Sequence, residues 1–306
     1  MSTNSTIRTR GASPQMQQVL QAIPANFADP HATAADVRAM FKAFHGHPTG
    51  KDLALSITTH GGVRCGHYAM HGQSNGWTVF HCHGGAFVST PLDEYHFYGE
   101  LIARQTGCAV VMPDYRLAPE TPYPAAADDC HAAWNGLLES GYPPHRMIIM
   151  GESCGGSLAL GLLQQLRDAG AALPACFISL TGWFDLSVQQ PNRVGHDPFL
   201  TAQWVRNRAR DYLAGSMALD DPRVSPAFAD LSGLPAMYLQ IGECDLLRHG
   251  AEHLARRAIE CGVAVNVEHW PGAVQGWHGL ANAHVPEALA AWRAIRRYID
   301  SLDGGD

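Results

Sequence analysis

A serine stands at the centre of the stretch "MGESCGGSLAL", flanked by glycines at positions 151 and 155. An apolar run, "RMIIM", precedes it and a run of small residues follows it. A Gly-x-Ser-x-Gly sequence between a strand and a helix is typical of a tight turn that exposes a nucleophile at a helix N-terminus. We therefore predict that Ser153 is a nucleophile and that the amide of Cys154, its thiol filling space, faces the same site.

A second turn that could support acyl chemistry lies about 70 residues upstream, in "FHCHGGAFVST". A His-Gly-Gly-Ala turn after a strand can direct successive N–H groups at a carbonyl oxygen as it becomes negative. We expect the amides of Gly85 and Ala86 to be these donors, with Gly84 giving the turn its freedom. His83 is expected to brace the turn by hydrogen bonding.

These turns must be positioned by regular secondary structure, and the sequence from Trp77 onward has a pattern that predicts it. Short apolar runs alternate with longer amphipathic segments, which predicts a mostly parallel sheet with helices on both faces, an α/β fold. The predicted strands are "WTVFHCH", "CAVVMPDY", "RMIIMGE", "ACFISLTG" and "AMYLQIGE". The predicted helices are Tyr95–Gln105, Ala125–Ser140, Gly156–Ala169, Gly250–Cys261 and Pro286–Leu302.

Two segments depart from this alternation. Residues 1–50 hold two helical patterns and no strand, and a further helical insert is expected around residues 185–219. Together they could form a cap over the end of the sheet. The predicted organisation is therefore a helical N-terminal cap segment, 1–50, and a catalytic domain, 51–306, interrupted by the insert.

Three blocks together resemble the hormone-sensitive-lipase family of α/β-hydrolase esterases. They are the His-Gly-Gly-Ala turn from His83, the stretch "DYRLAPETPYPAA" from Asp114, and the turn around Ser153, where Glu-Ser-Cys replaces the family's usual Asp-Ser-Ala. The resemblance implies an α/β-hydrolase fold and an oxyanion hole formed by the first block. It also implies a triad in the chain order Ser, Asp, His. For the second block it implies a structural role.

The resemblance places the acid of the triad in "LQIGECDLLRH". Asp245 follows a predicted strand and is succeeded by two leucines, as in the family, where its role is to orient the base. Glu243 is the alternative acid, but it lies two residues early.

The base is the irregular element. In the family a histidine follows a Trp-Pro-Gly-x-x pattern, and laying "WPGAVQGW" on that pattern without a gap puts Gln275 at the histidine position. A carboxamide has no basic nitrogen to accept the proton of a serine. Three explanations stay open: an engineered substitution that silences an esterase, a rearranged loop in which His278 is the base, or a relative that binds ligands without catalysis.

The predicted activity is hydrolysis of short acyl or small aryl carboxylic esters through an acyl-enzyme, since the family's cap encloses a pocket. Phe87 and Trp183 are expected pocket walls. Two alternatives are an amidase or formamidase with the same machinery and a non-catalytic small-molecule receptor. Neither a cofactor nor a metal is expected, because the paired histidines lack nearby carboxylate or thiolate partners.

Composition limits the remaining partners. The net charge of −7 gives no reason to expect nucleic acid or an anionic membrane, and no stretch is apolar enough to span a bilayer. No secretory signal is seen, and the eight cysteines are scattered, which together favour a reduced cytoplasmic chain. A homodimer is left open.

Overall fold

The parallel sheet predicted from the apolar runs is present in the computed structural model, which describes residues 11–24, 27–45, 50, 52–72, 74–194 and 197–304. Eight strands form one sheet in the order β1-β2-β4-β3-β5-β6-β7-β8. The pairs β1–β2 and β2–β4 are antiparallel, and all later neighbours are parallel. The predicted α/β class is confirmed.

Five strands coincide with the five predicted runs. Their residues are almost all buried, as expected for strands covered on both faces. They are β3 Thr78–Cys82, β4 Ala109–Pro113, β5 Met147–Glu152, β6 Cys176–Leu180 and β7 Ala236–Gly242.

The other three strands were not predicted, and they lie toward the two edges of the sheet. They are β1 Leu53–His60, β2 Val63–Met70 and β8 Val265–Trp270. β1 is exposed along its six central residues and β8 is only partly buried, so neither has a continuous apolar run. Their pairing with neighbours, rather than their own pattern, makes them strands.

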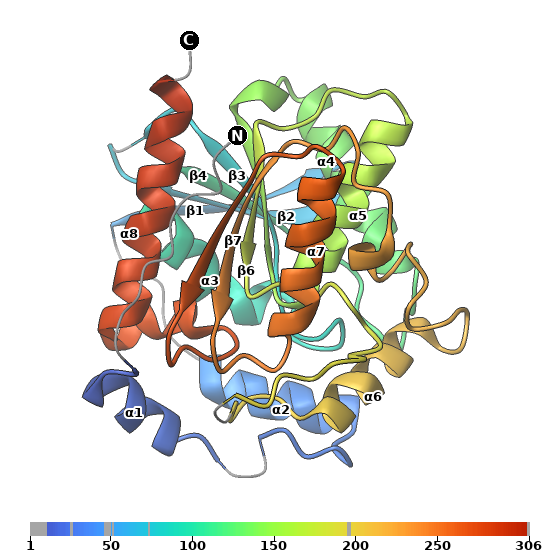
Figure 1. Ribbon diagram of the computed structural model, residues 1–306. Coiled ribbons are helices and arrows are strands. Elements are labelled where there is room, and N and C mark those ends of the chain that lie inside the picture. Colours follow the sequence, from blue (N-terminus) through green and yellow to red (C-terminus); the bar gives the residue numbers. More distant parts are fainter. Residues whose placement is uncertain are drawn as a thin grey trace.

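Helices cover both faces of the sheet (Figure 1). The helices α3 Leu92–Thr106 and α8 Pro286–Ser301 pack on one face, and α4 Ala125–Glu139, α5 Cys154–Asp168 and α7 Arg248–Glu260 pack on the other. All five predicted helices are therefore present, each within three residues of its expected ends. Short 3-10 turns occur at Pro144–Arg146, Pro226–Phe228, Trp277–Ala283 and Leu302–Gly304.

Three further helices lie beyond the sheet: α1 Pro14–Gln21, α2 Ala34–His45 and α6 Ala202–Leu213. In Figure 1, α2 and α6 lie together although they are far apart in sequence. Phe27, before α2, packs edge to face against Phe199, before α6, with ring centroids 5.3 Å apart. The Asn207 amide donates to Pro30 O at 2.7 Å. In the insert only α6 is helical, and the described residues before it form loops. The domain boundaries stay predictions.

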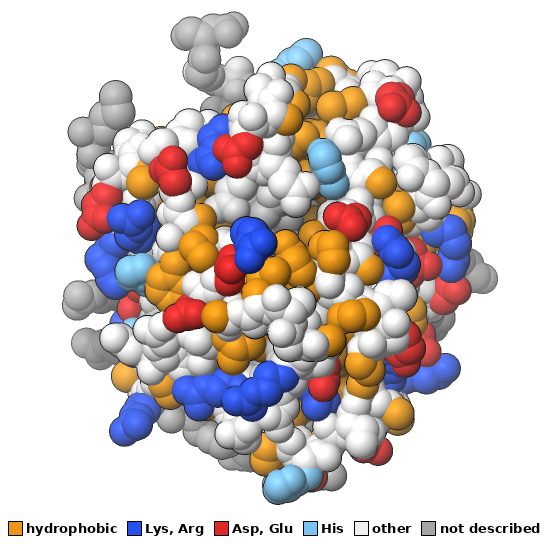
Figure 2. Space-filling model, turned by 90° about the vertical axis from the view of Figure 1, so that its right-hand side faces the viewer, with side chains coloured by type: hydrophobic (Ala, Val, Ile, Leu, Met, Phe, Trp, Pro, Cys, Tyr) orange, Lys and Arg blue, Asp and Glu red, His pale blue; other side chains and the backbone are white. Residues whose placement is uncertain are grey.

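The surface mixes charges of both signs. On the face shown in Figure 2, basic and acidic side chains are scattered among apolar and neutral ones, in keeping with the modest net charge. Within the described ranges, no helix is both long and apolar enough to cross a membrane.

Candidate active site

Ser153 occupies the sharp turn between β5 and α5 that its sequence predicts. Its backbone has φ 51° and ψ −123°, which is unfavourable for a residue with a side chain and marks a strained turn. The following Gly155 permits the turn, because an added Cβ would lie 2.0 Å from Cys82 O. Cys154 begins α5, so the N-terminus of that helix lies beside the serine hydroxyl.

The turn after β3 is equally strained and is braced from several sides. Gly85, Ala86 and Phe87 all have positive φ, and a Cβ on Gly85 would lie 2.1 Å from Thr90 Oγ1. The Thr90 hydroxyl donates to Gly84 O at 2.8 Å. Such bracing holds the backbone in a conformation that it would not otherwise adopt.

Residues behind the turn keep its amides in place. His83 stacks on Tyr115, of the "DYRLAPE" block, with ring centroids 4.0 Å apart, and the Tyr115 hydroxyl donates to His83 O at 2.8 Å. The Cys154 thiol accepts from Phe87 N at 3.2 Å, and burial raises the pKa of that thiol to about 12. It is therefore a neutral brace.

The amides expected to bind an oxyanion divide into two groups. Those of Gly85 and Cys154 donate to none of the described residues, and that of Ala86 lies beside the Cys154 thiol. The amide of Gly84 is already engaged, since it donates to Glu152 Oε2 at 3.2 Å.

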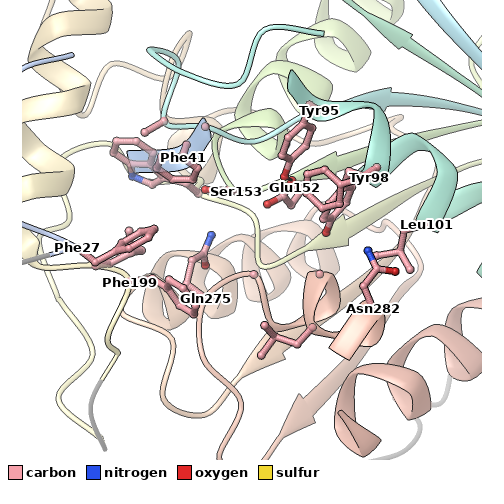
Figure 3. Close-up of a pocket in the computed structure, with 18 of the residues that line it drawn as sticks. Phe27, Phe41, Tyr95, Tyr98, Leu101, Glu152, Ser153, Phe199, Gln275 and Asn282 are labelled. Carbon is pink, nitrogen blue, oxygen red and sulfur yellow. Dashed lines mark hydrogen bonds between the residues drawn. The ribbon is translucent and has the colours of Figure 1, made fainter. Parts of the chain in front are cut away.

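The serine opens into one cavity of about 510 Å³ between the sheet and the N-terminal helices (Figure 3). Five residues singled out in the sequence line it: Gly85, Ala86, Ser153, Trp183 and Gln275. Phe87, Gly84 and Cys154 do not. The pocket role expected of Phe87 is therefore not seen; its ring stacks on Tyr212 at 3.8 Å and lies 5.6 Å from the Trp183 ring.

Aromatic and aliphatic side chains form much of the remaining wall. They come from the N-terminal segment and from the insert before and within α6: Phe27, Phe41, Phe199, Leu200, Trp204 and Val205. Their position gives the two helical segments a shared role, which is to enclose the cavity.

Gln275 lies in the loop after β8, and its side chain points toward Ser153 in Figure 3. Its Nε2 donates to Thr181 O at 3.1 Å, and its backbone N–H donates to Asp197 Oδ2 at 3.3 Å. Its carbonyl oxygen, Oε1, is buried and has no hydrogen-bond partner in the described part of the chain. A buried carbonyl without a donor is unfavourable, so this amide is imperfectly matched to its place.

His278 lies elsewhere, in the apolar core under α8. It is fully buried, its ring is 4.0 Å from that of Trp277, and its Nε2 is 2.7 Å from Gln240 Oε1. Burial lowers its pKa to about 3, which makes it a poor proton acceptor near neutral pH. It is not among the residues that line the cavity with Ser153.

Asp245 lies in the loop after β7 and is almost fully buried, and its Oδ1 accepts from Leu247 N at 2.9 Å. Glu243, the alternative acid, accepts instead from Gly272 N at 3.0 Å, at the start of the Gln275 loop. Burial, followed by the nearby Asp197 carboxylate, raises the pKa of Asp245 well above its usual value. Two buried carboxylates thus lie close together behind Gln275.

Sequence reasoning missed Asp197. Its carboxylate accepts from three segments: Phe199 N at 3.0 Å, Leu246 N at 3.0 Å and Gln275 N at 3.3 Å. It therefore joins the insert, the acid loop and the base loop. The Asp-Pro pair at 197–198 was visible only as a helix-start signal, and nothing local shows that the three amides converge there.

No metal centre is visible in this part of the fold. Among the residues described, no three His, Cys, Asp or Glu side chains come together in a way that could hold an ion. The chemistry available at the cavity is that of a hydroxyl, a set of amides and buried carboxylates.

Comparison with known proteins agrees with this geometry. Residues 79–279 match a family described as alpha/beta hydrolase fold. An acetyl-hydrolase from Streptomyces hygroscopicus is 33% identical, over 96% of this chain and 98% of its own length. The crystal structure of an esterase from the bacterial hormone-sensitive lipase family is 31% identical, with a TM-score of 0.87 over 96% of this chain and 99% of that one.

A third relative has a crystal structure obtained after soaking with an ester. The esterase EstE5, soaked with p-nitrophenyl butyrate, is 27% identical, with a TM-score of 0.86 over 95% of this chain and 99% of that one. The relatives thus match this chain along nearly its whole length. The chain belongs to the hormone-sensitive-lipase family of α/β-hydrolase carboxylesterases.

Proposed function

We propose that this fold hydrolyses short acyl or small aryl esters through an acyl-enzyme on Ser153, and that Gln275 leaves the chain as given with very weak turnover. The observation on which the proposal depends is the cavity that Ser153, the Gly85–Ala86 turn and Gln275 share. Membership of the carboxylesterase family supports the reaction class.

The proposed reaction begins with attack of Ser153 Oγ on the ester carbonyl carbon. The carbonyl oxygen becomes negative and is stabilised by the amides of Gly85, Ala86 and Cys154, each typically worth about 2.7–4 kcal/mol in the transition state. The tetrahedral intermediate then expels the alcohol and leaves an ester on Ser153, which water cleaves. Both steps need a group that accepts and returns one proton.

Residue 275 is the position for that group. It lines the cavity with Ser153, whereas His278 is bonded to Gln240 in the core and has a pKa lowered to about 3. A histidine at 275 would face the serine from the loop that Asp197 anchors. A glutamine there can donate and accept hydrogen bonds but cannot take the proton.

The paired carboxylates support the same assignment. Burial, followed by the nearby Asp197 carboxylate, raises the pKa of Asp245, so this carboxyl lies where its ionised form is disfavoured. An imidazolium formed at position 275 would favour the ionised form of Asp245, so the place behind Gln275 is suited to a charged base.

The size of the cavity supports a preference for small substrates. A cavity of about 510 Å³ is in the range of sites for small molecules and closes over a short chain. The name of the acetyl-hydrolase relative and the butyrate ester soaked into EstE5 indicate short acyl groups in those proteins. We propose the same range here.

A reduced, cytoplasmic setting is also proposed. All eight cysteines are free thiols, six of them buried in the fold, where they pack as small apolar side chains.

An acyl-chain series tests the proposed activity. In the Gln275→His variant, kcat/KM should be highest for acetyl to hexanoyl p-nitrophenyl esters and should fall for dodecanoyl and longer ones. A fluorophosphonate should add once per chain, at Ser153 by peptide mass, and Ser153→Ala should abolish the addition. Labelling that survives Ser153→Ala would refute the nucleophile, and undiminished activity on dodecanoyl esters would refute the enclosed pocket.

A further inference from the structure

The cavity has two unlike ends on either side of Ser153 (Figure 3). At one end lie Phe27, Phe41 and Phe199, whose rings offer no hydrogen bonds. At the other end lie Glu152, Tyr95 and Tyr98, with Leu101 and Asn282 farther from Ser153 on the same side. We call the end formed by Glu152, Tyr95 and Tyr98 the polar arm.

Glu152 is held in the polar arm by one of its two oxygens. Oε2 accepts from the Tyr95 hydroxyl at 2.7 Å and from Gly84 N at 3.2 Å. Oε1 accepts from none of the residues that the structure describes, and it lies toward the turn at Gly276, where an added Cβ would be 3.9 Å away. One acceptor edge of a fixed carboxyl is therefore unused.

Tyr98 contributes a second unused group. It is 2% exposed, its ring stacks on those of Tyr95 at 5.1 Å and His81 at 5.5 Å, and its hydroxyl has no hydrogen-bond partner over the described ranges. Burial and the charge of Glu152 both raise its pKa, so the phenol stays protonated. A buried hydroxyl without a partner is unfavourable unless a ligand completes its bonds.

The two unused groups complement each other. Glu152 Oε1 accepts, and the Tyr98 hydroxyl can donate or accept. A ligand hydroxyl satisfies both, since it has one proton to donate and lone pairs to accept. An ammonium group has three protons and no acceptor, so it would leave the Tyr98 proton unbonded.

We propose that the polar arm is a subsite for a hydroxyl group on the substrate, which donates to Glu152 Oε1 and accepts from the Tyr98 hydroxyl. The inference rests on the proposed function, because the ester must lie across Ser153 for its hydroxylated half to enter this arm. The substrate class becomes short esters that carry a free hydroxyl, such as monoesters of a diol or esters of a hydroxy acid.

Binding to the chain as given tests the subsite with little turnover, because the proposed function gives a chain with Gln275 very weak hydrolysis. Calorimetry would compare 4-hydroxybutyl butanoate with pentyl butanoate, and butyl 6-hydroxyhexanoate with butyl heptanoate. In at least one pair we expect the hydroxyl ester to bind about tenfold more tightly. Tyr98→Phe and Glu152→Gln should each abolish that preference, measured within each variant as the ratio of the Kd of the alkyl ester to that of the hydroxyl ester.

A matched control is Tyr142→Phe, which removes a tyrosine hydroxyl outside the cavity and should keep the preference. The subsite is refuted if both pairs bind equally, or if the preference survives Tyr98→Phe. It is also refuted if 4-aminobutyl butanoate binds more tightly than the hydroxyl ester. If no ester binds at all, while the chain is folded by circular dichroism, the proposed function fails together with the subsite.

Discussion

The two ends of the active site differ in how completely they are assembled. Around Ser153 the strained turns are braced by Thr90, Tyr115 and the Cys154 thiol, and the amides of Gly85 and Cys154 donate to no residue that the structure describes. Around Gln275 the side-chain oxygen has no donor in the described part of the chain, and two buried carboxylates lie together. The difference supports the proposal that position 275 is the place of a basic side chain.

Removal of the acid in the Gln275→His variant should have the largest effect. Asp245→Asn should lower kcat by about 10⁴, because the imidazole loses the group that orients it and stabilises its charged form. Initial rates with p-nitrophenyl butyrate measure this. Glu243→Gln is the control and should cost less than tenfold; the reverse order of the two losses would make Glu243 the acid.

Loss of the Asp197 charge should have an intermediate effect in the same variant. Asp197→Asn should lower kcat/KM by roughly 10- to 100-fold, because the NH₂ group replaces one of the two oxygens that accept from three backbone amides, and the base loop shifts. The acidic limb of the pH profile should also move to lower pH, because one negative neighbour of the imidazolium is gone.

The control for that variant is Asp185→Asn, whose carboxylate also accepts from backbone amides, those of Ser187 and Gln189. It should leave the position of the limb unchanged. An Asp197→Asn limb that stays in place would show that Asp197 has no electrostatic effect on the base.

The smallest effect concerns the stability of the chain as given. The folded pKa of Asp245 is raised, so the folded state binds more protons than the unfolded one. Stability is therefore lost as the pH rises from about 4, the ordinary aspartate pKa, through the raised value. Asp245→Asn should raise the free energy of unfolding by on the order of 1 kcal/mol at pH 8, which corresponds to an increase of about 2 °C in Tm.

The same substitution should add much less to the free energy of unfolding at pH 4, because the raised pKa of Asp245 keeps its carboxyl largely protonated there. Thermal unfolding by circular dichroism at both pH values measures the difference. An equal gain at both pH values would indicate that repulsion between the carboxylates is not the cause.

Local patterns predicted the sheet core and both turns, because each depends on residues adjacent in sequence. Five apolar runs predicted five strands, and the glycines on either side of Ser153 predicted the sharp turn between β5 and α5. The strands β1 and β8 lack such runs, so only their neighbours define them. The fold class was therefore predictable while the edges of the sheet were not.

Contacts between residues that are far apart in the sequence could not be predicted from local patterns. The Asp197 carboxylate accepts from backbone amides that lie 49 and 78 residues away in the sequence. Tyr98, on α3, lies near Glu152 at the end of β5 only because the fold brings the two elements together. The position of Gln275 followed from a gapless register in one loop. The burial of His278 against Trp277 could not be predicted, since its three-residue spacing from Gln275 fits either a base or a core residue.

The most direct test of the central claim is turnover of p-nitrophenyl butyrate by four chains: the chain as given, Gln275→His, His278→Asn and the double variant. Since loss of a triad histidine can cost on the order of 10⁶ in kcat, Gln275→His should raise kcat by at least about 10³, with an apparent pKa near neutrality. His278→Asn should change the restored rate only severalfold. His278, and not position 275, is the base if the chain as given is already as active as Gln275→His and a folded His278→Asn variant loses that activity.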